Sequence, residues 1–307
     1  MSDQDPPGFF DLQVNGYAGV DFNGDDLSGE QLHRACERLA ADGVDGILAT
    51  LTTDDVPRLA GRLERLAALR EQDPLARRTI AGVHVEGPFI SPVAGFRGAH
   101  PQRFIHPADV DEARRLLDAG AGLVRMVTLA PECDAGLAVT RLCADAGVVV
   151  AAGHCDPALD ELRAAIDAGL TVFTHLGNGC PLEMPRHDNV IQRVLSLGGS
   201  LWLTFIADGA HIPLFALGNF LALAGRDRAA VVSDAVAAAG LGPGTYRLGR
   251  REVVVGDDMI VRGPDGYLAG SGVTMARSAA NLREHLGLSD DTVRRLTSTN
   301  PRRAIGC

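Results

Sequence analysis

The stretch GVVVAAGHCDPALDELRAAIDAGLTVFTHL, residues 147–176, contains one complete unit of the pattern that determines the fold. Its two ends, residues 147–153 and 170–176, are short apolar runs that predict buried strands. Between them, residues 157–168 have the apolar spacing of an amphipathic helix. Short apolar strands that alternate with helices predict a parallel sheet covered on both faces.

The same unit recurs through most of the chain. Apolar runs predict strands at residues 9–14, 46–51, 79–85, 122–129, 147–153, 170–176, 200–207 and 229–234, and amphipathic stretches predict helices at 30–41, 54–72, 107–119, 134–146, 157–168, 189–197 and 212–224. Eight strands of this kind favour an α/β fold of the (β/α)8 TIM-barrel type. An open doubly wound sheet is the alternative, but its Gly-rich first turn has no counterpart in NGYAGVDFNG (15–24).

The pattern divides the chain into three parts. Residues 1–243 contain the predicted barrel and its catalytic site. Residues 244–268 predict one or two antiparallel hairpins, with turns at Gly256-Asp257 and at Pro264-Asp265-Gly266. Residues 269–307 predict two helices, at 272–287 and 289–298, that pack on the barrel.

The composition excludes several classes of protein. With 46% hydrophobic and 22% charged residues among 307, the chain has the balance of a folded protein and not of a disordered one. A net charge of −10 argues against nucleic acid or an anionic membrane surface as the main partner. No apolar run suits a membrane helix, the first residues lack a signal-peptide pattern, and the 6 cysteines form no C-x-x-C pair. We therefore expect a cytoplasmic protein with reduced thiols.

Polar residues gather where the predicted strands end, which is the end of a barrel at which active sites lie. Glu86, His154 and His175 all lie at such strand ends. One carboxylate and two imidazoles form the three-ligand set of a catalytic metal site with an open position for water. Taken singly, each histidine could instead be a satisfied polar residue in a loop. If all three groups lay close together in a closed site without a cation, they would have no partner. The sequence therefore predicts a divalent metal ion between them.

Asp234 ends the last predicted strand, so the barrel places it beside the same site. A carboxylate near a metal can accept the proton of an attacking water and return it to the leaving group. Asp234 is therefore the predicted general base and acid. The alternative is structural: Asp234 would cap a helix predicted by the sequence AVAAAG that follows it, residues 235–240.

Nine motifs in order along the chain carry a resemblance to a known family. They are PGFFDLQVNGYAGVDFN (7–23), GVHVEGPFISP followed by GAHP (82–101), VTLAPE (127–132), AAGHCDP (151–157), THLGNG (174–179), FIADGAHIP (205–213), VVSDAVAAAGL (231–241), LAGSGVTM (268–275) and TSTNPRRAIG (297–306). With these motifs the chain resembles the amidohydrolase superfamily and, within it, the N-acetylglucosamine-6-phosphate deacetylases.

The resemblance implies Glu86, His154 and His175 as metal ligands and Asp234 as the base, the same residues that the strand-end argument predicts. It also implies substrate contacts that the strand-end argument does not supply: Ala99, His100, Asn178, Gly179, Arg186, Asp208, Gly209, Ala210, His211, Leu268, Ala269 and Gly270. Many amidohydrolases bind a second metal through His-x-His on the first strand, where this chain has Gln13-Val14-Asn15. We therefore expect one divalent ion per subunit, with zinc favoured and iron or another divalent ion as the alternative.

The implied reaction is metal-dependent hydrolysis of the N-acetyl amide of N-acetylglucosamine 6-phosphate to glucosamine 6-phosphate and acetate. In this reaction His100 helps to polarise the amide carbonyl, His211 orients the substrate, and Arg186 binds the phosphate, in the partner subunit's site of a homodimer. The alternatives are a deacylase of another N-acyl amino sugar, a cyclic amide hydrolase on the same barrel, and a binding or regulatory protein on an inactive barrel.

The chain departs from the pattern of these deacetylases in three places. The loop LGNGCPLEMPRHDN (176–189) has Gly179 where they have another small residue, and His187-Asp188-Asn189 where they have Glu-Pro-Gly. This loop reads the sugar and its phosphate, and the alternative for Arg186 is a solvated loop residue. The chain also begins close to the first strand and ends at PRRAIGC (301–307), so we expect the family's small β-sandwich to be reduced to residues 244–268.

Overall fold

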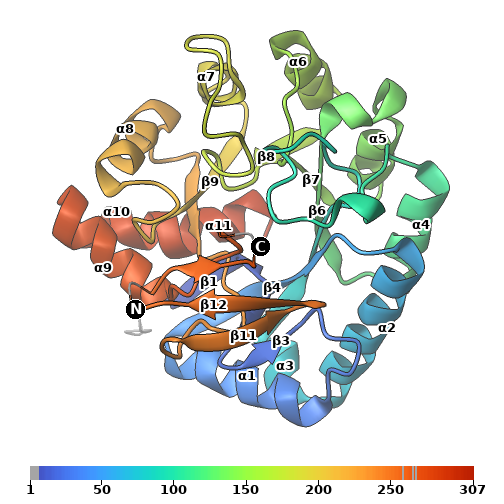
Figure 1. Ribbon diagram of the computed structural model, residues 1–307, viewed down its shortest axis with the longest axis vertical. Coiled ribbons are helices and arrows are strands. Elements are labelled where there is room, and N and C mark those ends of the chain that lie inside the picture. The colour runs from blue at the N-terminus through green and yellow to red at the C-terminus, as the bar shows by residue number, and fades with distance from the viewer. Residues whose placement is uncertain (1–6, 258, 265, 267) are drawn as a thin grey trace, which may run out of the picture.

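A ring of eight parallel strands forms the centre of the computed structural model, which describes residues 7–257, 259–264, 266 and 268–307 (Figure 1). The strands are β1 (Phe9–Val14), β4 (Val44–Thr52), β5 (Ile80–Glu86), β6 (Val124–Leu129), β7 (Val149–Ala152), β8 (Leu170–Phe173), β9 (Trp202–Ile206) and β10 (Ala229–Val232). They pair in the order in which they occur in the chain, and the pairs are parallel. This order confirms the (β/α)8 barrel and excludes the doubly wound sheet, in which the strand order reverses.

The ring closes between β1 and β10 through one bridge and side-chain hydrogen bonds. Val14 and Ala235 form an isolated parallel bridge, and the Ser233 hydroxyl donates to the Asp11 carboxylate at 2.5 Å. Burial raises the pKa of Asp11 to about 7, although the hydrogen bond from Ser233 opposes this shift. Asp11 thus belongs to the seam of the barrel. A short hairpin of β2 (Gly16–Tyr17) and β3 (Val20–Asp21) follows β1.

Helices surround the ring, as Figure 1 shows. They are α1 (Gly29–Ala41), α2 (Val56–Gln72), α3 (Pro74–Thr79), α4 (Val110–Ala119), α5 (Ala138–Asp145), α6 (Leu159–Asp167), α7 (Val190–Ser196) and α8 (Leu214–Ala224), followed after the ring by α9 (Met275–Leu286), α10 (Asp290–Arg294) and α11 (Asn300–Ala304). Shorter 3₁₀ turns lie at Gln102–Phe104, Pro131–Cys133 and Ala135–Leu137.

Local chemistry explains where these helices begin and end. Ser28 and Gln31 form a capping box at the start of α1, and the Asp55 side chain accepts a hydrogen bond from the backbone of Arg58 at the start of α2. The predicted helix 289–298 is divided, because a π-helical turn at Arg295–Thr299 separates α10 from α11.

In the described part of the chain, no helix is both long and apolar enough to cross a membrane.

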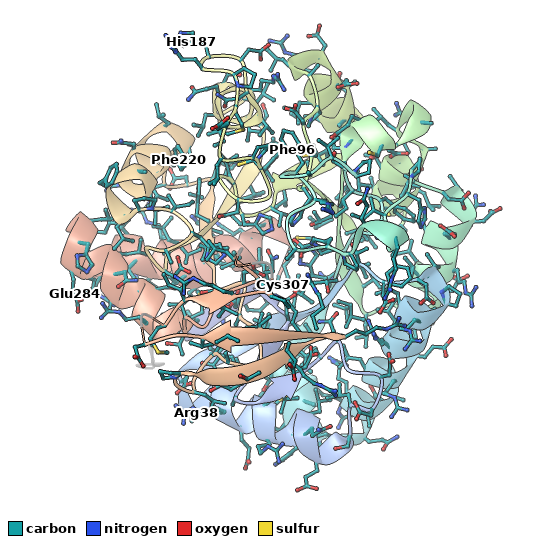
Figure 2. All side chains as sticks on the ribbon, viewed as in Figure 1. Arg38, Phe96, His187, Phe220, Glu284 and Cys307 are labelled. Atoms are coloured by element: carbon teal, nitrogen blue, oxygen red, sulfur yellow. The ribbon has the colours of Figure 1, made fainter. Side chains whose placement is uncertain are left out.

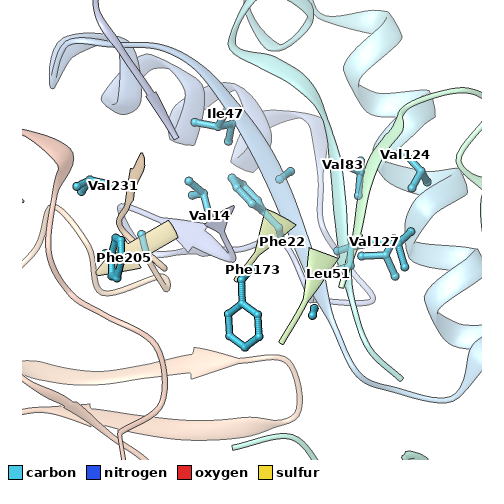
Figure 3. Packing of buried hydrophobic residues seen from close by; sticks show 14 of the residues in the cluster. Val14, Phe22, Ile47, Leu51, Val83, Val124, Val127, Phe173, Phe205 and Val231 are labelled. Carbon is cyan, nitrogen blue, oxygen red and sulfur yellow. The ribbon is translucent and has the colours of Figure 1, made fainter. Parts of the chain in front are cut away.

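Apolar packing lies on both sides of the ring. Figure 3 shows the layer between strands and helices around Ile47, Val83, Val124 and Val231. A second cluster includes the strand residues Phe10, Leu12, Leu48, Met126, Ala151, Val172, Ile206 and Val232. Ala304 and Ile305, at the end of α11, belong to this second cluster. Since α11 also bonds to Gly8, just before β1, it covers the amino ends of the strands.

Polar side chains lie closer than these apolar ones to the carboxyl ends of the strands. Nε2 of His84 is 2.7 Å from the Thr128 hydroxyl, which is 2.8 Å from the Thr174 hydroxyl. Burial lowers the pKa of His84 to about 4, so this imidazole is neutral. The strands therefore pass from apolar side chains to a buried polar network as they approach the end of the barrel where active sites lie.

A separate antiparallel sheet of β11 (Gly244–Leu248), β12 (Arg251–Val255) and β13 (Val261–Arg262) follows the ring. It packs through Leu248 and Val253 on Val236, in the segment after β10. Its first turn lies at residues 249–250, which the sequence pattern did not predict, and its second begins at residue 256 as expected. The other predicted turn, at residues 264–266, lies between Arg262 and Leu268, which form a bridge, but its Asp265 is outside the described residues.

Candidate metal centre and active site

The three predicted ligands meet at the carboxyl ends of three strands. Glu86 ends β5, while His154 and His175 closely follow β7 and β8, so the ring itself brings them together. One ligand atom from each lies within 4.8 Å of those of the other two. Glu86 Oε1 is 3.0 Å from His175 Nε2 and 3.5 Å from His154 Nε2. All three side chains are buried.

The chemistry of these groups fits a divalent cation. His154 Nδ1 lies 2.9 Å from the carbonyl oxygen of Phe96, which can only accept, so Nδ1 carries a hydrogen and Nε2 is the nitrogen that is available to a metal. Burial alone would raise the pKa of Glu86, but hydrogen bonds and charge from His154 and His175 hold it well below its ordinary value. An ionised carboxylate and two imidazole nitrogens are the ligand set of a catalytic metal site.

The backbone is strained at three of the candidate functional residues. Their φ angles are 52° at His154, 32° at His175 and 51° at Asp234, in the left-handed region that disfavours residues with a Cβ. Such conformations cost about 1–3 kcal/mol each and persist where the surrounding structure imposes them, often at active sites. At His154, His175 and Asp234 the surrounding structure therefore imposes the backbone conformation that places the side chain.

Asp234 lies beside the ligand group and is held by two amide side chains. Gln13 Nε2 donates to Glu86 Oε1 at 3.0 Å and to Asp234 Oδ1 at 3.1 Å, and Asn15 Nδ2 donates to the same Asp234 oxygen at 2.8 Å. Burial and the Glu86 charge raise the pKa of Asp234 to about 6. Residues 235–240 are not helical, so the alternative role of Asp234 as a helix cap is wrong.

Two of the predicted substrate segments lie against His154. A Cβ on Gly179, where φ is 60°, would be 2.8 Å from His154 Nδ1. The loop that carries Gly179 therefore approaches the His154 imidazole so closely that glycine is favoured at this position. The rings of His100 and His154 meet edge to face, with centroids 4.3 Å apart. The structure thus brings Ala99 and His100, and also Asn178 and Gly179, to the ligand group.

Asp208 and His211 form a partly buried pair. His211 Nδ1 is 2.7 Å from Asp208 Oδ2, which also accepts from the Ser271 hydroxyl at 3.0 Å. The backbone N–H groups of Ala210 and His211 both donate to Asp208 Oδ1 at 2.9 Å, and Gly209 completes the turn. Burial alone would raise the pKa of Asp208, but His211 and the backbone donors lower it to about 2. Both oxygens of Asp208 are therefore used to hold His211.

The segment Leu268–Gly270 runs beside Asp234. The N–H of the next residue, Ser271, donates to the Asp234 carbonyl at 2.8 Å, and Val236 donates to the Ser271 carbonyl at 3.0 Å. Ala269 is buried in the cluster that joins the small sheet to the barrel. This substrate segment is thus fixed next to the predicted base.

The structure does not bring Arg186 to the other predicted substrate residues. It is exposed, on the loop between β8 and α7. Figure 2 labels its neighbour His187 at the outer edge of the molecule. Arg193 anchors the base of this loop through ion pairs to Asp156 at 2.9 Å and to Asp188 at 2.6 Å. In the described part of the chain, no hydrogen bond or ion pair joins Arg186 to the ligand group.

Four residues of this site were not predicted as functional. Gln13 and Asn15 were considered only as missing ligands, whereas both bond to Asp234. Thr53, which contacts His100, follows a predicted strand and could have been found by the strand-end argument. Ser271 lies in no predicted strand, and nothing in its neighbourhood signals a bond to Asp208.

Together, the barrel, the Glu-His-His group at its carboxyl end and the buried aspartate define a metal-dependent hydrolase of the amidohydrolase type. The N-acetylglucosamine-6-phosphate deacetylase of Bacillus subtilis (strain 168) is 32% identical over 303 residues, which cover 98% of this chain and 75% of the relative. The chain belongs to the N-acetylglucosamine-6-phosphate deacetylase family, and it is a hydrolytic enzyme.

Two further comparisons agree with this membership. The structure of N-acetyl-D-glucosamine-6-phosphate deacetylase from Mycobacterium smegmatis, an aspartate-to-alanine mutant in complex with N-acetyl-D-glucosamine-6-phosphate, has a TM-score of 0.89 and 33% identity, with 98% of this chain and 77% of that chain covered. The N-acetylgalactosamine-6-phosphate deacetylase of Escherichia coli O157:H7 is 29% identical over 300 residues, covering 98% of this chain and 78% of the relative. No protein-family model matches the chain.

Proposed function

We propose that this chain hydrolyses the N-acetyl amide of N-acetylglucosamine 6-phosphate and releases acetate and glucosamine 6-phosphate. The observation that carries the proposal is the grouping of Glu86, His154 and His175 with Asp234 at one end of the barrel. The B. subtilis relative bears the name of this activity, and the M. smegmatis structure contains this sugar phosphate. The direct experiment is an assay of the purified protein for acetate release from that sugar.

Glu86, His154 and His175 would hold one divalent ion per subunit, with zinc favoured and iron or another divalent ion as the alternative. When bound, such an ion polarises a carbonyl group and lowers the pKa of a water molecule. Gln13 on β1 and Asn15 just after it direct their N–H groups at the carboxylates of Glu86 and Asp234, and an N–H group is not a metal ligand.

Asp234 would move the proton. Both amides donate to its Oδ1, so Oδ2 is the oxygen left to accept a proton from the attacking water. The water oxygen bonds to the carbonyl carbon, the C–N bond breaks, and the protonated Asp234 gives its proton to the amine that leaves. The second hydrogen of the water stays on the acetic acid that forms and is lost when this acid ionises to acetate, while the amine of glucosamine 6-phosphate takes up a proton.

His100 and His211 would orient the substrate and stabilise the developing charge. His100 Nε2 lies 3.7 Å from Glu86 Oε2, where a hydrogen-bond donor can stabilise the negative charge on the amide oxygen. His211, held by Asp208, would orient the sugar or the acyl group. The remaining predicted contacts would line the sugar site: Ala99, Asn178, Gly179, Gly209, Ala210, Leu268, Ala269 and Gly270.

Arg186 would bind the phosphate in the site of a second subunit, because the loop that carries it lies away from its own site. The neighbouring surface supports a homodimer. Leu182, on the same loop, is 98% exposed, and on α8 Phe215 is 76% and Leu223 is 64% exposed. Helix α8, LFALGNFLALA, contains no charged residue. An exposed apolar face of this kind is typical of a surface that another subunit covers.

Arg186→Ala should weaken the binding of the phosphorylated substrate by about 1.5–3 kcal/mol, the contribution of a charge-assisted hydrogen bond. Hydrolysis of the unphosphorylated N-acetyl sugar should be almost unchanged. Steady-state kinetics on both sugars measure the difference, with His187→Ala on the same loop and Arg163→Ala on α6 as controls. Equal loss on both sugars, or no loss on either, would show that Arg186 does not bind phosphate.

Mixing two variants tests whether Arg186 acts across a dimer. After subunit exchange, an Arg186→Ala subunit paired with an Asp234→Asn subunit should form one complete site if the arginine comes from the partner. Activity at substrate concentrations below KM should then exceed that of either variant alone. No gain on mixing, with exchange verified by mass, would place Arg186 in its own subunit's site or outside any site.

A panel of N-acetyl hexosamines, each with and without a 6-phosphate, tests the substrate. We expect kcat/KM for N-acetylglucosamine 6-phosphate to exceed that of the unphosphorylated sugar by at least about 10-fold, since 1.4 kcal/mol corresponds to a factor of ten. N-acetylgalactosamine 6-phosphate belongs in the panel because the E. coli relative bears its name. A preference for an unphosphorylated sugar would favour the deacylase of another N-acyl amino sugar.

The proposal also includes the cellular compartment of the enzyme and the division of its chain. The six cysteines are free, which supports a reducing cytoplasm. Residues 1–243 would form the catalytic barrel, residues 244–268 a small β segment, and residues 269–307 the helices that pack on the barrel. The chain spans about three quarters of the length of the B. subtilis relative, 75%.

A further inference from the structure

Thr53 touches the imidazole that faces the ligand group. It follows β4, and its hydroxyl oxygen lies 2.7 Å from His100 Nδ1 and 3.4 Å from the Glu86 carbonyl oxygen. Both side chains are buried, with Thr53 4% and His100 8% exposed. A Cβ on Gly87 would lie 2.1 Å from the Thr53 hydroxyl, so glycine at this position leaves the space that the hydroxyl occupies.

The contacts of His100 decide which of its nitrogens carries the hydrogen. Its Nδ1 faces the Thr53 hydroxyl and its Nε2 faces the Glu86 carboxylate, so a neutral imidazole has one N–H to place between these two partners. Nε2 is 3.7 Å from Glu86 Oε2, an ionised oxygen that can only accept. A lone pair on Nε2 would face the lone pairs of that oxygen. The hydrogen is therefore favoured on Nε2, and Nδ1 must accept.

The Thr53 hydroxyl has one hydrogen to give and two acceptors within reach. The His100 nitrogen is at 2.7 Å, within the normal range for such a bond, whereas the Glu86 carbonyl at 3.4 Å is near its limit. The hydroxyl therefore donates to Nδ1. The opposite arrangement would put a lone pair on Nε2 and make His100 a fourth metal ligand, but His100 is not among the atoms that group within 4.8 Å.

We propose that Thr53 is a positioning residue that holds His100 in the tautomer with hydrogen on Nε2, and so makes His100 a hydrogen-bond donor to the amide oxygen of the substrate. The proposal rests on the proposed function, because it assigns the state that His100 needs for that reaction. Both tautomers are neutral, so no change of charge is involved. The Thr53 hydroxyl acts through His100 and does not itself touch the reacting atoms.

Three variants test the kinetic consequence. Thr53→Val keeps the branched shape and removes the hydroxyl, Thr53→Ser keeps the hydroxyl, and Thr171→Val is a matched control at an exposed position of β8. We expect Thr53→Val to lower kcat by about 10–100-fold, as for other groups that orient an active-site histidine, with KM and metal content near those of the parent. Thr53→Ser should recover most of the lost kcat. Equal defects in Val and Ser, or normal kcat in Val, would overturn the proposal.

A spectroscopic measurement separates this role from packing. In protein labelled with ¹⁵N-histidine, the His100 signals, assigned by their loss in His100→Asn, should show hydrogen on Nε2 and a bare Nδ1. In Thr53→Val the same signals should move toward a mixture of tautomers. Hydrogen on Nδ1 in the parent protein would overturn the proposal directly, whatever the kinetics show.

His100→Asn also distinguishes failure of this inference from failure of the proposed function. If His100→Asn loses most of its activity while Thr53→Val keeps a normal kcat, the role of His100 stands and that of Thr53 is wrong. If His100→Asn remains fully active, His100 has no part in the reaction and the role of Thr53 falls with it. Acetate release by the parent protein tests the reaction itself and is independent of both outcomes.

Discussion

Asp234→Asn should lower kcat by roughly 10²–10⁴-fold, the usual contribution of a general base. The hydrogen bonds of Asp234 allow this substitution to remove the proton acceptor alone. Gln13 and Asn15 both donate to Oδ1 of Asp234, and the amide oxygen of an asparagine can accept the same two hydrogen bonds. The side chain would keep its position, while an NH₂ group would replace Oδ2 and could no longer accept a proton. The loss should therefore appear in kcat with little change in KM.

Metal content and a surface variant control this experiment. Asp234→Asn leaves Glu86, His154 and His175 intact, so its metal content should equal that of the parent protein. Asp167→Asn, at the exposed end of α6, makes the same chemical change away from the site and should be fully active. Near-normal turnover in Asp234→Asn would transfer the role of base to another group, with His100 and His211 the first to examine.

The spacing of apolar residues along the chain and the order of the strands made the barrel predictable from the sequence. Buried parallel strands are continuous apolar runs, so each of the eight stood out, and their sequential order in the ring is the simplest one for repeated βα units. The turn at residues 249–250 was missed because Gly249-Arg250 is a weak turn signal compared with Gly256-Asp257. The division of residues 289–304 by a π-helical turn depends on packing and leaves no mark in an amphipathic pattern.

The strand-end argument predicted the ligand group of the site but not its supporting contacts. Glu86, His154 and His175 come together because the carboxyl ends of the barrel strands meet at one end of the ring, which the repeated βα pattern already implies. The bonds of Gln13 and Asn15 to Asp234 depend on closure between the first and last strands, some 220 residues apart, with separations of 221 and 219. Side-chain rotamers across such a seam cannot be read from local sequence.

Loss of one ligand should abolish metal binding and activity together. Parent protein is expected to carry one divalent ion per chain, and His175→Asn close to none, because two remaining groups do not complete the three-ligand set of such a site. An ion that polarises the amide and activates water supplies several kcal/mol, so activity should fall by at least about 10³-fold. Elemental analysis of the purified proteins gives the stoichiometry, and acetate release gives the activity.

His33→Asn on α1 is the matched control, since His33 is exposed and pairs with Asp73 far from the ligand group along the chain. Removing the metal from the parent with a chelator should produce the same loss as His175→Asn, and adding back zinc, iron or another divalent ion one at a time should show which ion restores turnover. The side-chain amides of Gln13 and Asn15 determine the expected number of metal ions. Gln13 and Asn15 direct their N–H groups at Glu86 and Asp234, and an N–H group repels a cation. Two equivalents of tightly held metal would mean that these amides turn to present oxygen, and full activity with no metal would overturn the metal-dependent reaction itself.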